Sequence, residues 1–141
     1  MKIETHYAPG EMMSVLKDAD ATLVGNCFEN CVIAVLALHA SNNLEYVLGF
    51  LTSPDRKMVA HAWLRYDGGS VPIYLDPTLQ ATSPLWNRMK QEFLYDERFS
   101  YAREQLVQYF KDKYPGRDFS DSGIPSGRVT GPVITDAGKL V

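Results

Sequence analysis

The sequence predicts an α+β fold in which a central helix packs on a small antiparallel sheet, with flanking helices towards the C-terminus. Three observations support this fold class. A segment over about residues 28–40 is apolar nearly all round, as expected for a helix in the middle of a fold. Three strand-like segments follow between residues 44 and 75, separated by short turns. Beyond residue 83, apolar side chains recur at helical spacing.

Composition limits the class of protein. The chain has 141 residues, 45% of them hydrophobic, which is enough for one domain with its own core. The formal net charge is -3 and no basic run stands out, so we expect neither a nucleic-acid nor a membrane partner. No apolar run reaches transmembrane length, and residues 1–6 lack the apolar segment of a signal peptide, so we expect a cytoplasmic protein.

We expect the domain to span residues 1–116 and to be followed by an irregular tail at 117–141. The tail has four glycines and few large apolar side chains. Within the domain, residues 1–8 suit a short edge strand that Pro9-Gly10 ends, and residues 11–17 have the apolar spacing of a short helix. A loop then leads to a turn at Gly25-Asn26, where the central helix begins.

The strands are predicted at Leu44–Thr52, Met58–Tyr66 and Val71–Leu75. Both alternating sets of side chains in the first strand are apolar, which is typical of a strand covered on both faces. Gly68-Gly69 predicts a hairpin between the second and third strands. Pro72 places the third strand near an edge of the sheet.

Two helices are predicted in the second half of the chain, after a loop at residues 79–85. Ser83-Pro84 can start the first, and Asp96-Glu97 the second. The apolar positions of the first are Trp86, Met89 and Phe93; those of the second are Phe99, Ala102, Leu106, Tyr109 and Phe110.

The two cysteines differ in position. Cys27 lies at the expected start of the central helix, where unpaired backbone N–H groups and the helix dipole favour the nucleophilic thiolate. The alternative is a structural thiol, the commonest role of a free cysteine. Cys31 lies one helical turn further on, so we expect it in the core. Four residues on a helix is an awkward spacing for a disulfide, and two free thiols are the simpler interpretation.

The predicted hairpin brings together a second pair of groups. A loop at Gly68-Gly69 sets Asp67 opposite Ser70 and, further along the ladder, His61 opposite Asp76. A carboxylate there fixes the tautomer of the histidine and stabilises its protonated form. With Cys27, these residues make a nucleophile, a base and an orienting acid. The Cys27 N–H and Asn26 are candidate oxyanion donors.

Three short motifs carry a resemblance to a known family. Gly25-Asn26-Cys27, His61-Ala62-Trp63 and Asp76-Pro77-Thr78, in this order, resemble the core of the transglutaminase-like superfamily, a branch of the papain-like cysteine-enzyme fold. The resemblance covers about residues 24–80 and implies that Cys27, His61 and Asp76 are a catalytic triad. The family includes cross-linking acyltransferases, peptidases, amidases, deamidases and inactive members.

Some features depart from that family. The aromatic residue after the cysteine is present only as Phe28, and the positions about six residues upstream hold Ala21 and Thr22 where a papain-type enzyme has a glutamine. The second oxyanion donor is therefore open. Besides Asn26, Phe28 and Trp63 are candidates for contact with the substrate.

The expected function is hydrolysis of a protein or peptide amide through a thioester, without a cofactor. The enzyme would be a peptidase, an amidase or a glutamine deamidase. Three alternatives stay open: transglutaminase-type transfer to an amine, an inactive binding module on the same fold, and a zinc site. The ligands of that zinc site would be Cys27, Cys31, His61 and Asp76.

Overall fold

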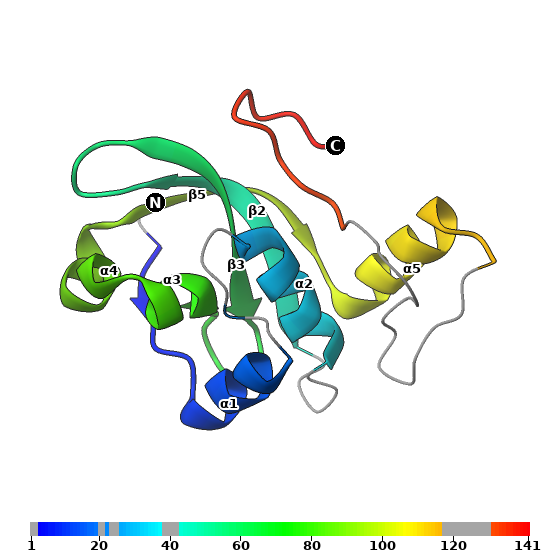
Figure 1. The fold of residues 1–141 in the computed structure, drawn as a ribbon, viewed down its shortest axis with the longest axis horizontal. Helices are drawn as coiled ribbons and strands as arrows, with labels where there is room; N and C mark the ends of the chain where they lie inside the picture. The colour runs from blue at the N-terminus through cyan, green and yellow to red at the C-terminus, as the bar shows by residue number, and fades with distance from the viewer. Residues whose placement is uncertain (1–2, 20–21, 23–25, 38–42, 117–130) are drawn as a thin grey trace.

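A computed structural model gives the fold of the chain (Figure 1). It describes residues 3–19, 22, 26–37, 43–116 and 131–141. In chain order, the elements are β1 (Thr5–His6), α1 (Gly10–Asp18), α2 (Cys27–Ala37), β2 (Leu44–Thr52), β3 (Met58–Tyr66), β4 (Ile73–Leu75), α3 (Pro77–Thr82), α4 (Pro84–Met89), the 3-10 helix η1 (Lys90–Glu92), β5 (Leu94–Tyr101) and α5 (Arg103–Lys113).

The predicted α+β class is confirmed, but the sheet is mixed. Its five strands have the order β1-β4-β3-β2-β5. Strand β1 runs parallel to β4, with Thr5 beside Tyr74, whereas all other neighbours are antiparallel. The expectation of an antiparallel sheet was therefore wrong at this edge. Parallel neighbours cannot be joined by a hairpin, and β1 reaches β4 only after the chain has passed through α1, α2, β2 and β3.

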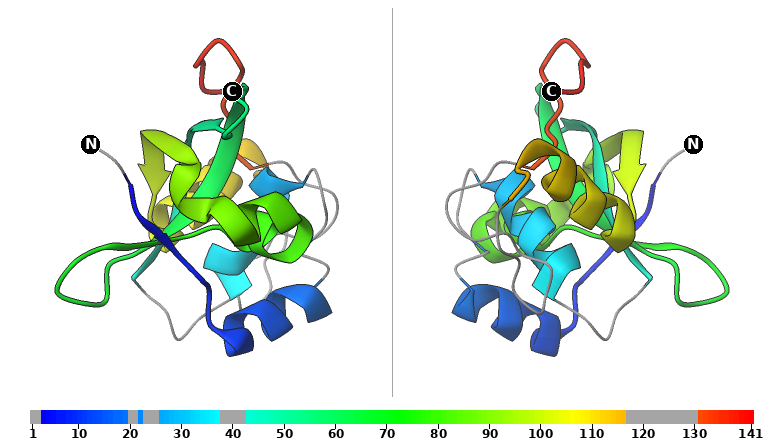
Figure 2. Two further views of the ribbon diagram at one scale, coloured as in Figure 1. Left: turned by 90° about the vertical axis from the view of Figure 1, so that its left-hand side faces the viewer. Right: turned by 90° about the vertical axis from the view of Figure 1, so that its right-hand side faces the viewer.

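The central strands have the predicted bounds. Strands β2 and β3 pair along their whole length, from Leu44 with Tyr66 to Thr52 with Met58. Strand β4 is shorter than predicted and begins after Pro72, which is consistent with a residue that has no N–H to donate. The loop between β3 and β4 projects from the body of the molecule (Figure 2).

The helix expected to start at Asp96-Glu97 does not begin there. Residues Leu94–Tyr101 form β5 on the edge of β2, and the helix α5 starts only at Arg103. Phe99 and Tyr101 are two residues apart and both pack against the larger core cluster, a spacing that suits a strand as well as their spacing to Leu106 suits a helix. A bulge opposite Leu48-Gly49 shifts the register midway along this pair.

A second correction concerns residues 77–82, where part of the predicted loop at 79–85 is helical. Helix α3 has Pro77 in its first turn, and the Asp76 side chain accepts a hydrogen bond from the Leu79 N–H at 3.1 Å. A proline in the first turn after an N-cap aspartate is a standard helix start. Helix α4 begins as predicted, with Ser83 as its N-cap.

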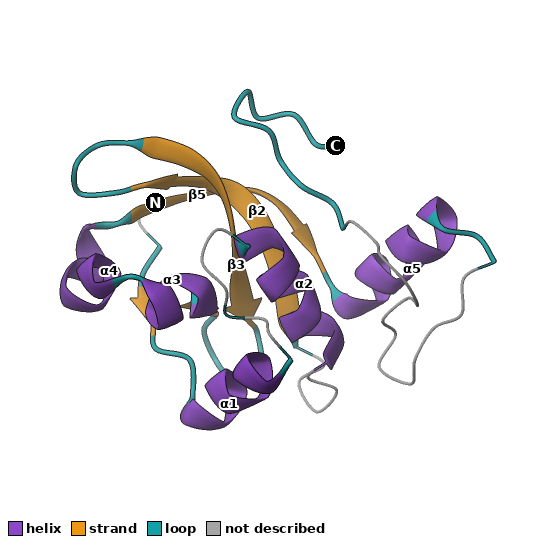
Figure 3. Ribbon diagram, in the orientation of Figure 1, coloured by secondary structure: helices purple, strands orange, loops and turns teal. Residues whose placement is uncertain are grey.

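Helices cover both faces of the sheet. Helix α2 lies across β3 and β2, and the structure places α3 and α4 on one side of α2 and α5 on the other (Figure 3). The larger core cluster joins α1, α2 and α5 to the face of the sheet that carries Ala62 and Leu64. On the opposite face, Trp63 packs in a smaller cluster with Trp86 of α4 and Tyr95 of β5. Because neighbouring residues of a strand face opposite sides, β3 contributes to both cores.

The described part of the predicted tail, residues 131–141, packs on the larger core. It contains no helix, and its strand pairing is one bridge between Ile134 and Leu140. Ile134 is buried, and the Tyr46 hydroxyl donates a 2.6 Å hydrogen bond to the Pro132 carbonyl. Residues 117–130 lie outside the described residues. In the part of the chain that is described, no helix has the length and apolar character needed to cross a membrane.

Candidate active site

Cys27 is the first residue of α2. Asn26 precedes the helix, and its carbonyl accepts the first helical hydrogen bond from the Asn30 N–H at 2.8 Å. The side chain of Cys27 is partly exposed, whereas Cys31, one turn further on, is completely buried. Cys27 therefore lies at the positive end of the helix dipole and keeps some contact with solvent. Gly25 and Ala21 lie outside the described residues.

His61 and Asp76 are in contact, although the predicted register of their strands was wrong. The His61 Nε2 atom lies 2.7 Å from Asp76 Oδ2. Strands β3 and β4 pair Leu64 with Leu75, two positions away from the predicted pairing, because the connecting loop is longer than a Gly-Gly turn. Asp76 follows β4 as the N-cap of α3. A shift of two residues keeps side chains on the same face of a strand, so the contact survives the change of register.

Every oxygen of the Asp76 carboxylate accepts a hydrogen bond, and the residue has no exposed surface. Oδ1 accepts from the Leu79 N–H, and Oδ2 accepts from both His61 Nε2 and the Tyr95 hydroxyl. A buried charge is tolerated only when it is paired and hydrogen-bonded. One carboxylate thus starts a helix and binds the histidine ring.

The electrostatics favour the protonated form of His61. Burial alone would lower the pKa of this ring, but the charge of Asp76 and the hydrogen bond to it outweigh burial and raise the pKa to about 10. A side-chain hydrogen bond with Cys27 adds to this increase. Since Asp76 binds Nε2, the nitrogen left for the Cys27 thiol is Nδ1. The structure therefore brings together the three residues predicted as nucleophile, base and orienting acid.

Two residues of the site were not predicted. The Tyr95 hydroxyl donates to Asp76 Oδ2 at 2.6 Å, and the Trp86 indole N–H donates to the Tyr95 oxygen at 2.9 Å. Burial and the neighbouring Asp76 raise the pKa of Tyr95 well above its usual range, so this hydroxyl stays a donor. The interpretation of the following residues as a helix hid the strand pairing of Tyr95 with Leu51, which places Tyr95 on the face of the sheet that carries Trp63.

The side chains proposed for substrate contact lie in different surroundings. Trp63 is fully buried and stacks on His61, with ring centroids 6.1 Å apart. A substrate could contact the Trp63 indole only if the residues that bury it moved away. In the structure the indole packs against the His61 imidazole. Phe28 is half-buried and packs against the larger core. Asn26 is partly exposed directly beside Cys27.

A hydrogen bond joins the two helices that carry Cys27 and Asp76. Asn30, one turn after the thiol position on α2, donates from its side-chain amide to the Thr78 hydroxyl at 2.9 Å, and both residues are buried. Thr78 lies in the first turn of α3, two residues after Asp76. This bond fixes the start of α2 relative to the carboxylate.

The zinc alternative has no support from the arrangement of ligands. Burial, followed by the charges of Asp76 and Cys27, raises the pKa of the Cys31 thiol well above its usual range, which disfavours the thiolate that zinc binds. Among the residues that the structure describes, no three His, Cys, Asp or Glu side chains are grouped as metal ligands.

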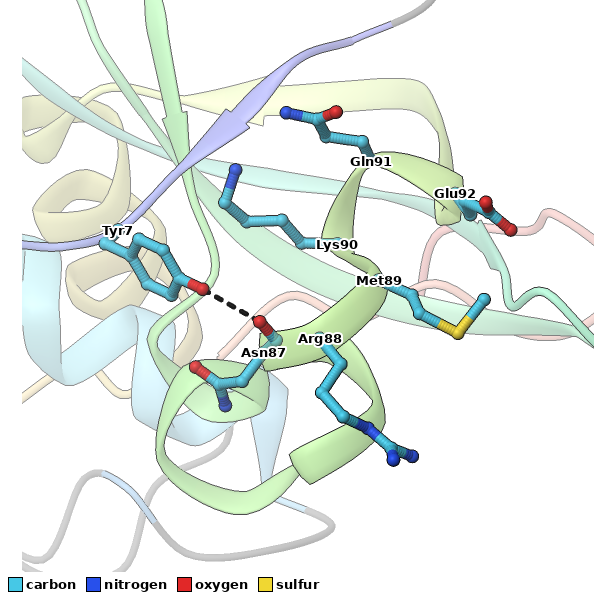
Figure 4. Close-up of a pocket in the computed structure, with 7 residues that line it drawn as sticks. All are labelled: Tyr7, Asn87, Arg88, Met89, Lys90, Gln91 and Glu92. Carbon is cyan, nitrogen blue, oxygen red and sulfur yellow. Dashed lines mark hydrogen bonds between the residues drawn. The ribbon is translucent and has the colours of Figure 1, made fainter.

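Two surface pockets lie elsewhere on the described part of the molecule. One, of about 430 Å³, is formed by Tyr7 and residues 87–92, and there the Tyr7 hydroxyl donates to the Asn87 carbonyl at 2.9 Å (Figure 4). The other, of about 500 Å³, is more apolar and lies between β1, α1 and the ends of β3 and β4. Neither is lined by Cys27, His61 or Asp76.

Comparisons of the chain with protein-family models, with curated proteins and with solved structures found no match.

Proposed function

We propose that this protein is a cysteine-dependent hydrolase of protein or peptide amides, built on a papain-like core of the transglutaminase-like type. The observation that carries the proposal is the order of contacts from Cys27 at a helix N-terminus to His61 and from His61 to a buried carboxylate. This is the nucleophile, base and orienting group that covalent catalysis needs.

The resting state follows from the charge of His61. At neutral pH the ring holds its proton, because its pKa is raised to about 10 by Asp76 against the effect of burial. The proposed attack requires Cys27 as the thiolate, the form that cysteine enzymes stabilise with a neighbouring imidazolium. The Cys27 sulfur then attacks the amide carbonyl carbon directly, and the carbonyl electron pair moves to the oxygen. The Cys27 N–H and the Asn26 side chain are the candidate donors to that oxyanion.

The remaining steps use the same proton. His61 Nδ1–H protonates the departing amine, the C–N bond breaks, and a thioester with Cys27 forms. Neutral His61 then takes a proton from water, the hydroxide adds to the thioester carbonyl, and the C–S bond breaks to restore the thiolate and imidazolium. Partial exposure of Cys27 favours water as the acceptor, since water can reach the thioester. An amine in place of water would give a transglutaminase reaction.

The test compares the two cysteines. Alkylation of each thiol by iodoacetamide at about pH 6 is followed by mass spectrometry in the wild type, Cys27→Ala, Cys31→Ala and His61→Gln. We expect rapid alkylation of Cys27 and none of buried Cys31, and a rate at Cys27 that falls at least about tenfold in His61→Gln. A rate at Cys27 equal to that of free glutathione, and insensitive to His61, would overturn the proposal.

The reaction itself is then read from the products. Unfolded proteins and glutamine-containing peptides are incubated with the wild type and both cysteine variants, in the presence and absence of a primary amine. Mass spectrometry distinguishes cleavage, deamidation and amine incorporation. We expect cleavage or deamidation that needs Cys27 and is retained in Cys31→Ala. Amine incorporation in place of hydrolysis would contradict the choice of water as acceptor, and the absence of any product would favour the binding module.

A further inference from the structure

We propose that Tyr95 is a positioning residue of this site: its hydroxyl, oriented by Trp86, shares Asp76 Oδ2 with His61 and so controls how tightly His61 holds its proton. The inference rests on the proposed function for its catalytic consequence. Its structural part, the sharing of one carboxylate oxygen by two donors, stands on geometry alone.

The direction of each hydrogen bond follows from chemistry. The indole nitrogen of Trp86 can only donate, so at 2.9 Å it uses the Tyr95 oxygen as acceptor. Tyr95 has one hydroxyl proton, and the acceptor facing it is Asp76 Oδ2 at 2.6 Å. The same oxygen accepts from His61 Nε2 at 2.7 Å. Trp86 therefore directs the hydroxyl proton of Tyr95 onto the oxygen that binds the histidine.

Packing fixes this arrangement. Trp86 and Asp76 have no exposed surface, and Tyr95 is 5% exposed. The rings of Tyr95 and Trp63 meet edge to face with centroids 4.9 Å apart, and Trp63 stacks on His61 in turn. Oδ1 of the carboxylate is bound by the Leu79 N–H. With both oxygens occupied, the carboxylate cannot rotate without losing a buried hydrogen bond.

The shared oxygen has an electrostatic consequence. In the described elements, the titratable groups around Asp76 are His61 of β3, Tyr95 of β5 and Cys31 of α2, and Cys27 of α2 lies beside His61. Of these, Tyr95 and His61 donate to the carboxylate directly. A hydroxyl that donates to Oδ2 takes up part of its negative charge, so less of that charge stabilises the imidazolium. Removal of the hydroxyl should leave His61 more basic.

The experiment measures the titration of His61 itself. The imidazole nitrogens are followed by ¹⁵N NMR against pH in the wild type, in Tyr95→Phe and in Tyr101→Phe as a matched control. Tyr101 lies on the same strand and has no hydrogen bond to Asp76 among the contacts the structure gives. We expect the pKa of His61 to rise by about half a unit to one unit in Tyr95→Phe and to stay unchanged in Tyr101→Phe.

A second variant keeps the proposal testable if Tyr95→Phe does not fold. Site-specific 3-fluorotyrosine at position 95 preserves packing and makes the hydroxyl a stronger donor, so the His61 pKa should shift in the opposite direction, downwards. An unchanged titration in both folded variants would overturn the proposal. These measurements need no substrate, so their failure is distinct from the absence of a Cys27-dependent reaction. Where the reaction is present, kcat should fall in Tyr95→Phe with KM unchanged.

Discussion

The raised pKa of His61 predicts a specific dependence of stability on pH. In the folded protein the attraction of Asp76 outweighs burial and raises the pKa of this ring to about 10, against 6.5 for an unperturbed histidine. Below about pH 6.5 both the folded and the unfolded chain bind the proton, and the His61 pair contributes fully to stability. As the pH rises from there towards 10, the unfolded chain loses the proton while the folded protein keeps it. The contribution is therefore lost as the pH rises through this window.

The magnitude follows from the size of the window. Where the folded state binds one proton more than the unfolded state, the free energy of unfolding falls by about 1.4 kcal/mol per pH unit. Between about pH 6.5 and about pH 9.5 this amounts to about 4 kcal/mol, an upper limit set by a fully buried pair. Both proteins are compared in the Cys27→Ala background, because a thiolate at Cys27 in the folded state would bind one proton fewer than the unfolded thiol and would cancel the extra proton on His61. His61→Gln lacks the titrating group, so subtraction of its stability removes the effects of the lysines and tyrosines that both proteins share.

The assay is urea unfolding of Cys27→Ala and of Cys27→Ala/His61→Gln under reducing conditions at several pH values. We expect the stability difference between the two proteins to shrink by several kcal/mol from about pH 6.5 to about pH 9.5. A stability difference that stays constant over this range would refute the argument, because it would mean that the Asp76 contact does not hold a proton on His61. A difference that grows with pH would show that burial outweighs the carboxylate.

Three further predictions concern the surroundings of the site. Thr78→Val should lower the free energy of unfolding by about 1–2 kcal/mol, because Asn30 loses its buried acceptor. In the same urea assay, the free energy of unfolding of Thr78→Ser should stay within about 0.5 kcal/mol of the wild type. Equal effects of the two substitutions would refute a role for the hydroxyl. Gly49→Ala should lower the free energy of unfolding by about 3 kcal/mol or more, because the added Cβ would clash with the Asp96 carbonyl and the Trp63 ring. A melting temperature equal to that of the wild type would contradict this expectation. Tyr46→Phe should lower the free energy of unfolding by about 1 kcal/mol, because the hydrogen bond to the Pro132 carbonyl is lost. Hydrogen exchange of the Val133 and Val141 amides should become faster, since this bond holds residues 131–141 on the core. Unchanged exchange would contradict this role of the Tyr46 hydroxyl.

Local signals in the sequence were sufficient for the centre of the fold. The bounds of β2 and β3 follow from apolar runs between polar turns, and the start of α2 follows from Asn26. These signals act over a few residues. The parallel contact of Thr5 with Tyr74 depends on segments far apart in the chain, and no local pattern specifies it.

The candidate site was predicted for a reason that the structure corrects. Cys27, His61 and Asp76 were selected from helix capping and an assumed hairpin register, and the actual register differs by two residues. The prediction of the contact tolerates that error because alternate residues share a face. The contacts of Tyr95 and Trp86 could not be predicted in this way. Tyr95 reaches Asp76 because β5 pairs with β2, and the sequence of β5 was interpreted as the start of a helix.

The position of β5 in the chain has a consequence for synthesis. Strands β2 and β3 are joined by a short turn and can pair as soon as both have left the ribosome, whereas β5 docks on β2 only after α3, α4 and η1 have been made. A nascent chain that ends before Leu94 already holds Cys27, His61 and Asp76, but the carboxylate has neither the Tyr95 donor nor the strand that buries it. We expect the buried contact of His61 with Asp76 to take its final form late, once translation has passed β5.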